Sequence, residues 1–467
     1  MAPKKFFLLL IALFFIRLPV PAQTGSLPRL KVSANRHFLM TEGGQPFFWL
    51  GDTGWLLFIK LNREEAARYL EDRKQKGFNV IQVMLLHTLG AVNTYGDTAL
   101  NGKRVSTPNT TEGSLFSNPA QYDFWDHVDY IIDLAAQKGL YMALVPVWGT
   151  NVKNGGVSQQ DAAVYAKWLA ERYRNRSNII WLNGGDIRGS DSANTWKTIG
   201  RTLRQNDTNH LVSFHPYGRT SSGEWFHNED WLQFNMFQSG HRSYDLDTSA
   251  AEHRFGPDNY RFVQIDYKRQ PVKPTLDGEP SYEQIPYGLH DTTKPRWNDN
   301  DVRRYGYWEV FAGGAGYTYG HNSVMQMYKH SDTVIDYGAQ GYWYEAISHP
   351  GAGQMIYLKK LLLARSYFDR VPDQSLVAGS QGERYNYIAA TRGSGYAYLY
   401  DYTGRPFGVN MGKISGAAVQ ASWYNPRTGS TTRIGQFANR GVQRFTPPGA
   451  KQEGNDWVLV LESIRKK

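Results

Sequence analysis

The chain has 467 residues, 41% of them hydrophobic and 20% charged, which is typical of a globular protein of two or three domains and excludes a disordered one. Its formal net charge of +10 is spread along the sequence without a long Lys/Arg block, which argues against nucleic acid as a partner. It contains no cysteine, which excludes disulfides and a lipid anchor attached to cysteine.

The first 22 residues have the pattern of a secretory signal peptide. Lys4 and Lys5 precede an apolar run over residues 6–16 that is too short to span a membrane, and residues 20–22 resemble a small-residue cleavage site. We therefore expect a mature chain that begins at Gln23, carries a net charge of +7 after the loss of three basic residues, and is periplasmic or secreted. No later segment is apolar enough to predict a membrane span.

Short apolar runs alternate with helical patterns between residues 46 and 368, after a lead-in hairpin predicted at 30–45. Strands are predicted at 46–53, 79–86, 141–148, 178–186, 211–215, 232–238, 272–279 and 316–321. Helices are predicted at 62–77, 125–138, 162–174, 195–204, 259–268, 302–312 and 354–368, and Asn62 and Glu65 form a capping box. This alternation predicts an α/β fold, a (β/α)8 TIM barrel, with residues 89–122 as a long active-site loop.

After about residue 376 the pattern changes to short alternating runs separated by turn residues, which predicts a small antiparallel β-sandwich. The expected domains are a signal peptide at 1–22, a barrel at 23–373 and the sandwich at 374–467. Because no Pro/Ser/Gly-rich linker separates Phe368 from Tyr385, we expect the two folded domains to pack together.

Two acidic residues follow glycines at the ends of the fourth and seventh predicted strands. Asp186 ends Asn183-Gly184-Gly185-Asp186, and Glu279 lies in Asp277-Gly278-Glu279-Pro280. A retaining glycosidase needs two carboxyl groups roughly 5–5.5 Å apart, and barrel enzymes place their chemistry at strand ends. Alternatively, Asp186 caps the next helix and Glu279 forms a loop salt bridge.

The segments 48–53, 183–186 and 276–280 resemble the apiosidase-like family, glycoside hydrolase family 140, and residues 423–429 resemble the β-domain, named for collagen binding, that follows its barrel. The resemblance covers nearly the whole mature chain. It implies that Asp186 is the acid/base, that Glu279 is the nucleophile, and that apiose-linked side chains are removed from the pectin rhamnogalacturonan II. The wider clan usually has Asn-Glu where this chain has Gly185-Asp186, so the shorter acid requires the backbone or the substrate to lie closer.

Other polar and aromatic residues near strand ends are candidates for substrate binding, in line with an aromatic content of 14%. We expect about half of them to contact sugar and the rest to pack the barrel mouth. No His-Glu-x-x-His motif occurs, so neither a metal nor a cofactor is expected. The candidates are Asp52, Trp55, His87, Trp148, Asn183, His215, Tyr217, His241, Tyr319 and His321.

The expected partner is an oligo- or polysaccharide, bound by a monomer, and the basic charge balance favours an acidic polymer. One alternative is a glycosidase that acts on arabinan, xylan or glucan. Another is a non-catalytic carbohydrate-binding protein with an inactive barrel, although the presence of both Asp186 and Glu279 argues against it.

Overall fold

A computed structural model describes residues 27–248 and 252–464, so the predicted signal peptide at 1–22 lies outside the described residues. The described chain opens with a three-stranded antiparallel sheet, β1 (Leu30–Val32), β2 (Leu39–Thr41) and β3 (Pro46–Phe47). The predicted hairpin is therefore a meander, and its turn at residues 42–44 joins β2 to β3. In the described ranges no helix is long and apolar enough to cross a membrane.

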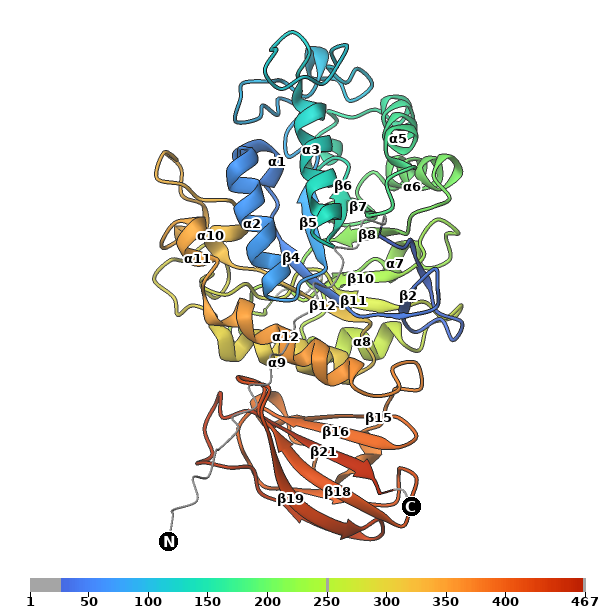
Figure 1. The fold of residues 1–467 in the computed structure, drawn as a ribbon, viewed down its shortest axis with the longest axis vertical. Coiled ribbons are helices and arrows are strands. Elements are labelled where there is room, and N and C mark those ends of the chain that lie inside the picture. The colour runs from blue at the N-terminus through green and yellow to red at the C-terminus, as the bar shows by residue number, and fades with distance from the viewer. Residues whose placement is uncertain (1–26, 249–251, 465–467) are drawn as a thin grey trace, which may run out of the picture.

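The centre of the molecule is a parallel barrel, as predicted (Figure 1). Its strands are hydrogen-bonded in the order β8-β7-β6-β5-β4-β12-β11-β10, and the short β9 (Thr220–Ser221) pairs antiparallel with β10. A backbone hydrogen bond of 2.9 Å from Gln233 to Val212 links the two edges of the sheet. The barrel strands are β4 (Trp49–Thr53), β5 (Val80–Met84), β6 (Tyr141–Val145), β7 (Ile179–Ile187), β8 (Val212–Pro216), β10 (Asn235–Gln238), β11 (Thr275–Asp277) and β12 (Gly316–Tyr319).

Helices surround this barrel, and polar residues fix where several of them begin (Figure 1). The predicted capping box of Asn62 and Glu65 is present, and similar boxes start α3 at Asp123 and α9 at Asn298. The α-helices are α1 (Leu57–Lys60), α2 (Arg63–Gln75), α3 (Phe124–Gln137), α4 (Gly149–Lys153), α5 (Gln159–Tyr173), α6 (Ala193–Asn206), α7 (Gly223–Phe226), α8 (Tyr260–Asp266), α9 (Asp299–Phe311), α10 (Asn322–Met325), α11 (Trp343–Ala346) and α12 (Pro350–Leu363). Short 3-10 turns are η1 (Asn101–Lys103), η2 (Asp336–Gly338), η3 (Gln374–Leu376) and η4 (Arg384–Asn386).

The C-terminal region is an antiparallel β-sandwich, as predicted. One of its sheets has the order β13-β15-β16-β21-β18-β19 and the other the order β14-β17-β20. Alternate apolar side chains of both sheets, such as Leu399, Val409 and Leu459, share one core. The strands are β13 (Val371–Pro372), β14 (Val377–Ala378), β15 (Ile388–Arg392), β16 (Tyr396–Asp401), β17 (Phe407–Asn410), β18 (Ala418–Tyr424), β19 (Thr431–Ala438), β20 (Val442–Phe445) and β21 (Trp457–Ser463).

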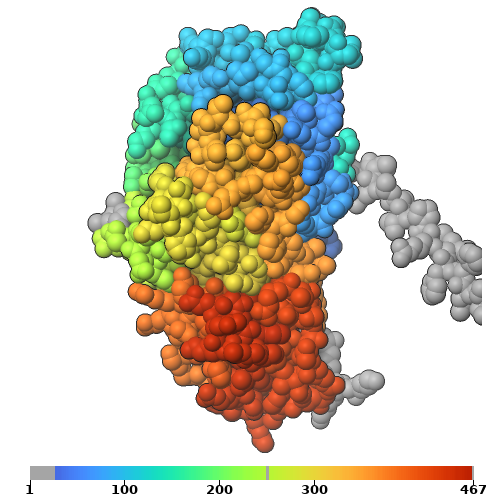
Figure 2. Space-filling model, turned by 90° about the vertical axis from the view of Figure 1, so that its left-hand side faces the viewer, coloured from blue at the N-terminus to red at the C-terminus, as the bar shows by residue number. Residues whose placement is uncertain are grey.

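The sandwich packs directly against the barrel (Figure 2), and its strands β15 and β16 contact the barrel helix α9. Arg303 of α9 is fully buried, and its guanidinium donates two hydrogen bonds, of 2.9 and 3.0 Å, to the Asp456 carboxylate of the sandwich. The ring of Tyr307 stacks on Tyr400 with centroids 4.7 Å apart. Because a buried charge is costly unless it is paired, the Arg303–Asp456 pair fixes this interface in one arrangement.

Candidate active site

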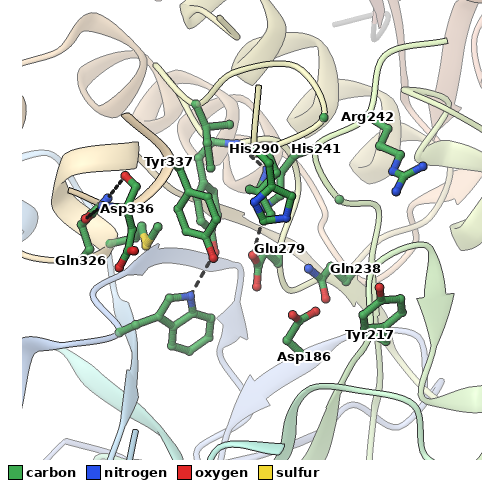
Figure 3. Close-up of a pocket in the computed structure, with 18 of the residues that line it drawn as sticks. Asp186, Tyr217, Gln238, His241, Arg242, Glu279, His290, Gln326, Asp336 and Tyr337 are labelled. Carbon is green, nitrogen blue, oxygen red and sulfur yellow. Dashed lines mark hydrogen bonds and ion pairs between the residues drawn. The ribbon is translucent and has the colours of Figure 1, made fainter. Parts of the chain in front are cut away.

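A cavity of about 250 Å³ opens at the C-terminal ends of the barrel strands (Figure 3). Its walls come from the ends of β4, β5, β6, β7, β8 and β10 and from the loops that follow β11 and α10, and they bring Asp186 and Glu279 together. No residue of the predicted active-site loop at 89–122 lines it. That loop instead packs on α3, where Trp125 donates a hydrogen bond of 2.9 Å to the Ala99 carbonyl.

Asp186 reaches the cavity through a bulge in β7. Gly184, Gly185 and Asp186 have φ angles of 91°, 107° and 46°, and the pairing of β7 with β8 shifts register between Gly184 and Ile187. A Cβ atom on Gly185 would lie 2.5 Å from the ring of Trp148, and one on Gly184 would lie 2.7 Å from the His215 carbonyl. Both glycines are therefore required, because only glycine fits these left-handed positions.

Glu279 is fixed from below by the buried carboxylate of Asp277. One Asp277 oxygen accepts the backbone N–H groups of Glu279 and Ser239, each at 3.2 Å, and the other accepts the Ser239 hydroxyl at 2.5 Å. Gly278 has no room for a side chain, because a Cβ atom there would lie 2.3 Å from the Met236 sulfur. These contacts tie the ends of β10 and β11 together and set the direction of the Glu279 side chain.

Two histidines face the Glu279 carboxylate. His241 Nε2 lies 3.1 Å from Oε1, and His215 Nε2 lies 3.3 Å from Oε2. The Nδ1 atom of His241 accepts the backbone N–H of Tyr282 at 3.4 Å, and that of His215 accepts the backbone N–H of Asp186 at 3.3 Å. A neutral imidazole that accepts at Nδ1 carries its proton on Nε2, so both histidines present an N–H to Glu279.

The two carboxyl groups have opposite pKa shifts. Burial, and then the nearby charge of Glu279, raise the pKa of Asp186 to about 6. Burial would also raise the pKa of Glu279, but the hydrogen bonds from His215 and His241 outweigh it and lower the pKa to about 2. Between these two values Asp186 is protonated while Glu279 is ionised.

Of the ten residues predicted to bind substrate, five line the cavity: Trp55, His87, Trp148, Tyr217 and His241. Trp55 and Trp148 form an aromatic wall, with ring centroids 5.4 Å apart. His215 is fully buried behind this wall, where it contacts Glu279, and does not line the cavity itself. Contact of these residues with a sugar stays a prediction.

The other four predicted residues, Asp52, Asn183, Tyr319 and His321, do not line the cavity. Asp52 turns to α2, where it pairs with the buried Arg73 at 3.3 Å and accepts the Tyr69 hydroxyl. His321 caps α10 by accepting the Ser323 N–H at 3.1 Å. Successive side chains of a strand point in opposite directions, so a position at a strand end does not by itself place a side chain in the barrel mouth.

The side chains of Asn183 and Tyr319 also form hydrogen bonds within the protein and not in the cavity. The Asn183 amide donates to the Trp196 carbonyl in α6 at 2.8 Å and accepts the N–H of Gly184 at 3.0 Å. The Tyr319 hydroxyl donates to buried Glu283 at 2.6 Å. Asn183 thus joins β7 to α6, and Tyr319 joins β12 to the loop that follows β11.

Sequence reasoning missed several polar residues of the cavity wall. Gln238 ends a predicted strand and could have been found by the same rule that selected Asp186. Tyr282 lies just after Glu279, and its hydroxyl accepts a hydrogen bond of 3.2 Å from Trp55. No local sequence signal marks the loop residues Arg242, His290, Asp336 and Tyr337, which also line the cavity.

Arg242 is a half-buried cation on the same side of Glu279 as Asp186 and Tyr217 (Figure 3). Its guanidinium donates to the Leu246 carbonyl at 3.2 Å, and within the part of the chain that the structure describes no acidic side chain forms an ion pair with it. The neighbouring Arg219 is neutralised, by Asp247 at 2.6 Å and by a second acid. Arg242 is thus free to meet an anion.

Comparisons with known proteins agree with this geometry. Residues 33–369 match the family described as "Apiosidase-like, catalytic domain", and residues 371–462 match "Putative collagen-binding domain of a collagenase". A solved structure named glycoside hydrolase is 46% identical with a TM-score of 0.90, and the match covers 94% of this chain and 98% of that one. A glycoside hydrolase family 5 structure from Bacteroides vulgatus is 43% identical with a TM-score of 0.88, over 94% of each chain. No curated protein matches the chain.

Proposed function

The chain belongs to the apiosidase-like family of glycoside hydrolases, and from that membership we propose that it is a retaining enzyme that cleaves apiosidic linkages in the side chains of the pectin rhamnogalacturonan II. The observation that carries the mechanism is that Asp186 and Glu279 line one cavity at the strand ends, and their surroundings shift the two pKa values in opposite directions, to about 6 for Asp186 and about 2 for Glu279. A glycosidase needs one proton donor and one ionised carboxylate before the first step, and this pair supplies both.

In the first step Glu279 attacks the anomeric carbon while Asp186 gives its proton to the glycosidic oxygen. The bond from the anomeric carbon to that oxygen breaks, an ester to Glu279 forms, and the leaving sugar departs as an alcohol. The N–H groups of His215 and His241 hold Glu279 ionised until it attacks. The wall of Trp55 and Trp148 offers flat faces for the sugar ring.

In the second step the roles of the two groups reverse. Esterification removes the charge of Glu279, which had raised the pKa of Asp186, so Asp186 now ionises more readily. It takes a proton from water as the water oxygen attacks the anomeric carbon, and the ester bond to Glu279 breaks. Two inversions leave the configuration at the anomeric carbon unchanged.

An acidic polymer fits the charges on the leaving-group side of the cavity. Arg242 lies there without an acidic partner among the described residues, so it can bind a carboxylate of a pectic sugar. The basic net charge, +10 for the whole sequence and +7 for the expected mature chain, also favours the approach of a polyanion.

A product assay on rhamnogalacturonan II tests the specificity, with homogalacturonan, xylan and arabinan as controls. Release of fragments that end in apiose supports the proposal, whereas cleavage of arabinan or xylan alone would assign the enzyme to another polysaccharide. The configuration of the first product, followed by NMR before mutarotation, separates retention from inversion. A product of inverted configuration would rule out the nucleophilic role of Glu279.

Two substitutions test the roles of the acids. Glu279→Gln should abolish turnover with every leaving group. Asp186→Asn should abolish turnover of natural glycosides yet still form the glycosyl-enzyme from an activated aryl glycoside, whose leaving group needs no proton. Azide should then restore turnover of Asp186→Ala and give a glycosyl azide of retained configuration. Near-normal activity of Glu279→Gln would contradict the assignment.

A further inference from the structure

Gln238, the last residue of β10, is a buried amide in the cavity wall near Asp186 (Figure 3). Its side chain lines the cavity on the side of Asp186, Tyr217 and Arg242, whereas Asp336 and Tyr337 lie on the other side of Glu279 (Figure 3). The residue is only 4% exposed. A hydrogen bond of 2.6 Å from the Arg219 N–H to the Gln238 carbonyl anchors its backbone, so the side chain projects from a fixed point.

The side-chain amide of Gln238 interacts with Asp186 but leaves its Oε1 atom without a hydrogen-bond donor among the described residues. The side chain lies beside Asp186 in the cavity wall (Figure 3), and its interaction with that carboxyl group lowers the pKa of Asp186, against the larger opposing effect of burial. Its Oε1 atom is buried and accepts no hydrogen bond from any residue that the structure describes. An unpaired buried carbonyl is unfavourable in a folded protein, so a site that keeps one requires an explanation.

Gln326 shows what a purely structural glutamine looks like in the same wall. Its amide N–H groups donate to the Asn322 carbonyl at 3.0 Å and to the Asp336 carbonyl at 3.0 Å, and its Oε1 accepts the Asp336 N–H at 3.2 Å. Both ends of Gln326 are therefore satisfied within the protein. The free acceptor of Gln238 is a property of that position and not of glutamines at this cavity in general.

We propose that Gln238 binds the sugar on the leaving side of the scissile bond. Its Oε1 accepts a hydrogen bond from a hydroxyl of that sugar, and its N–H group holds the Asp186 carboxyl toward the glycosidic oxygen. A sugar hydroxyl supplies the missing donor, and the position of Gln238 beside Asp186 places that hydroxyl next to the oxygen that is protonated. The assignment rests on the proposed function, because it takes Asp186 as the acid.

The variant Gln238→Leu keeps the approximate size of the side chain and removes both polar atoms. Comparing kcat/KM of wild type and variant on substrates with three different leaving groups distinguishes the contact with the sugar hydroxyl from the contact with Asp186. A pectic oligosaccharide uses both contacts, a methyl glycoside uses only the Asp186 contact, and an activated aryl glycoside uses neither. We expect kcat/KM to fall about 100-fold, about 10-fold and less than about 3-fold in that order, since each hydrogen bond contributes about tenfold. Equal losses on all three substrates would overturn the proposal, as would no loss on the oligosaccharide.

The pH dependence of kcat/KM tests the contact of Gln238 with Asp186, because a purely structural role of Gln238 would leave it unchanged. Removing a donor to the ionised carboxylate raises the pKa of Asp186, so the basic limb of kcat/KM should shift to higher pH in Gln238→Leu. Gln326→Leu is the matched control, for which we expect a lower Tm and an unmoved limb. A basic limb of Gln238→Leu that coincides with that of the wild type would contradict the contact with Asp186.

Failure of the proposed function can be told apart from failure of this inference. If rhamnogalacturonan II is not cleaved, the same series is made on whichever control glycan is cleaved, and the order of losses still decides the role of Gln238. NMR titration of the Asp186 carboxyl in wild type and Gln238→Leu needs no turnover at all. An unchanged titration there overturns the inference even when cleavage of rhamnogalacturonan II is intact.

Discussion

Replacing His241 by phenylalanine should shift the acid limb of the pH profile to higher pH. Phenylalanine keeps the edge-to-face contact with Tyr282, whose ring lies 4.7 Å from that of His241, but removes the N–H that reaches Glu279 at 3.1 Å. A hydrogen bond to a charged group contributes about 1.5–3 kcal/mol, which corresponds to about 1–2 pKa units. The pKa of Glu279, about 2 in the wild type, should therefore rise to about 3–4 in the variant.

The assay is kcat/KM of an activated aryl glycoside between pH 2.5 and 8. On this aryl glycoside the wild type should be active down to the lowest pH at which it stays folded. A natural glycoside, which needs the proton of Asp186, should show the basic limb, with activity lost above about pH 6. His241→Phe should lose activity already below about pH 4. His290→Phe removes a histidine that lines the cavity without contacting Glu279, and its acid limb should match that of the wild type.

The lowered pKa of Glu279 should also make the stability of the fold depend on pH. The pKa of Glu279 lies below its ordinary value of 4.5, so its ionised form stabilises the fold above pH 4.5, and this contribution is lost as the pH falls through about 2. His241→Phe should thus destabilise the protein more at pH 6 than at pH 2.5. Overlapping acid limbs of His241→Phe and the wild type would refute the idea that the histidines hold Glu279 ionised.

Three further substitutions test the site and its frame. Gly185→Ala puts a Cβ atom 2.5 Å from the Trp148 ring at a φ of 107°, so Tm should fall and kcat/KM should drop at least about tenfold; an active, stable variant would contradict the required bulge. Asp52→Ala removes one of the two acidic partners of buried Arg73 and leaves only Asp72, so it should cost about 1.5–3 kcal/mol in urea unfolding, with KM unchanged in the folded fraction; a raised KM with unchanged stability would support a role of Asp52 in substrate binding. Arg242→Ala should raise KM about tenfold for acidic pectic fragments but not for neutral aryl glycosides; equal effects on both would exclude carboxylate binding.

The barrel could be predicted from the sequence because its strands are buried on both faces. Each is a short apolar run that ends in glycine or a polar residue, a pattern that needs no knowledge of the neighbours. Helix starts at residues such as Asn62 could be predicted because a cap is a contact within three residues. Long-range features, including the order of strands in the sandwich, have no such local signal.

The candidate site could be predicted only in part. Asp186 and Glu279 are visible because glycines next to an acid at a strand end mark an unusual backbone. The side chain of Asp52 meets α2 and not the cavity, because one residue of register decides between these two directions, and the sequence does not show the register. Arg242 and Asp336 come from loops, and their place in the cavity depends on how those loops fold over the strand ends.

The contact of α9 with the sandwich bears on how the two domains unfold and how they could be recombined. Separating them would expose Arg303 and the faces of Tyr307 and Phe311, which now lie against Asp456, Tyr400 and Tyr398. Each separated domain would then expose to water aromatic rings and a charge that has lost its partner in the other domain. We therefore expect the two domains to unfold in a single cooperative calorimetric transition, and we expect the isolated barrel to aggregate. A chimera that grafts this barrel onto another partner would have to carry the matching aromatic and acidic face along with it.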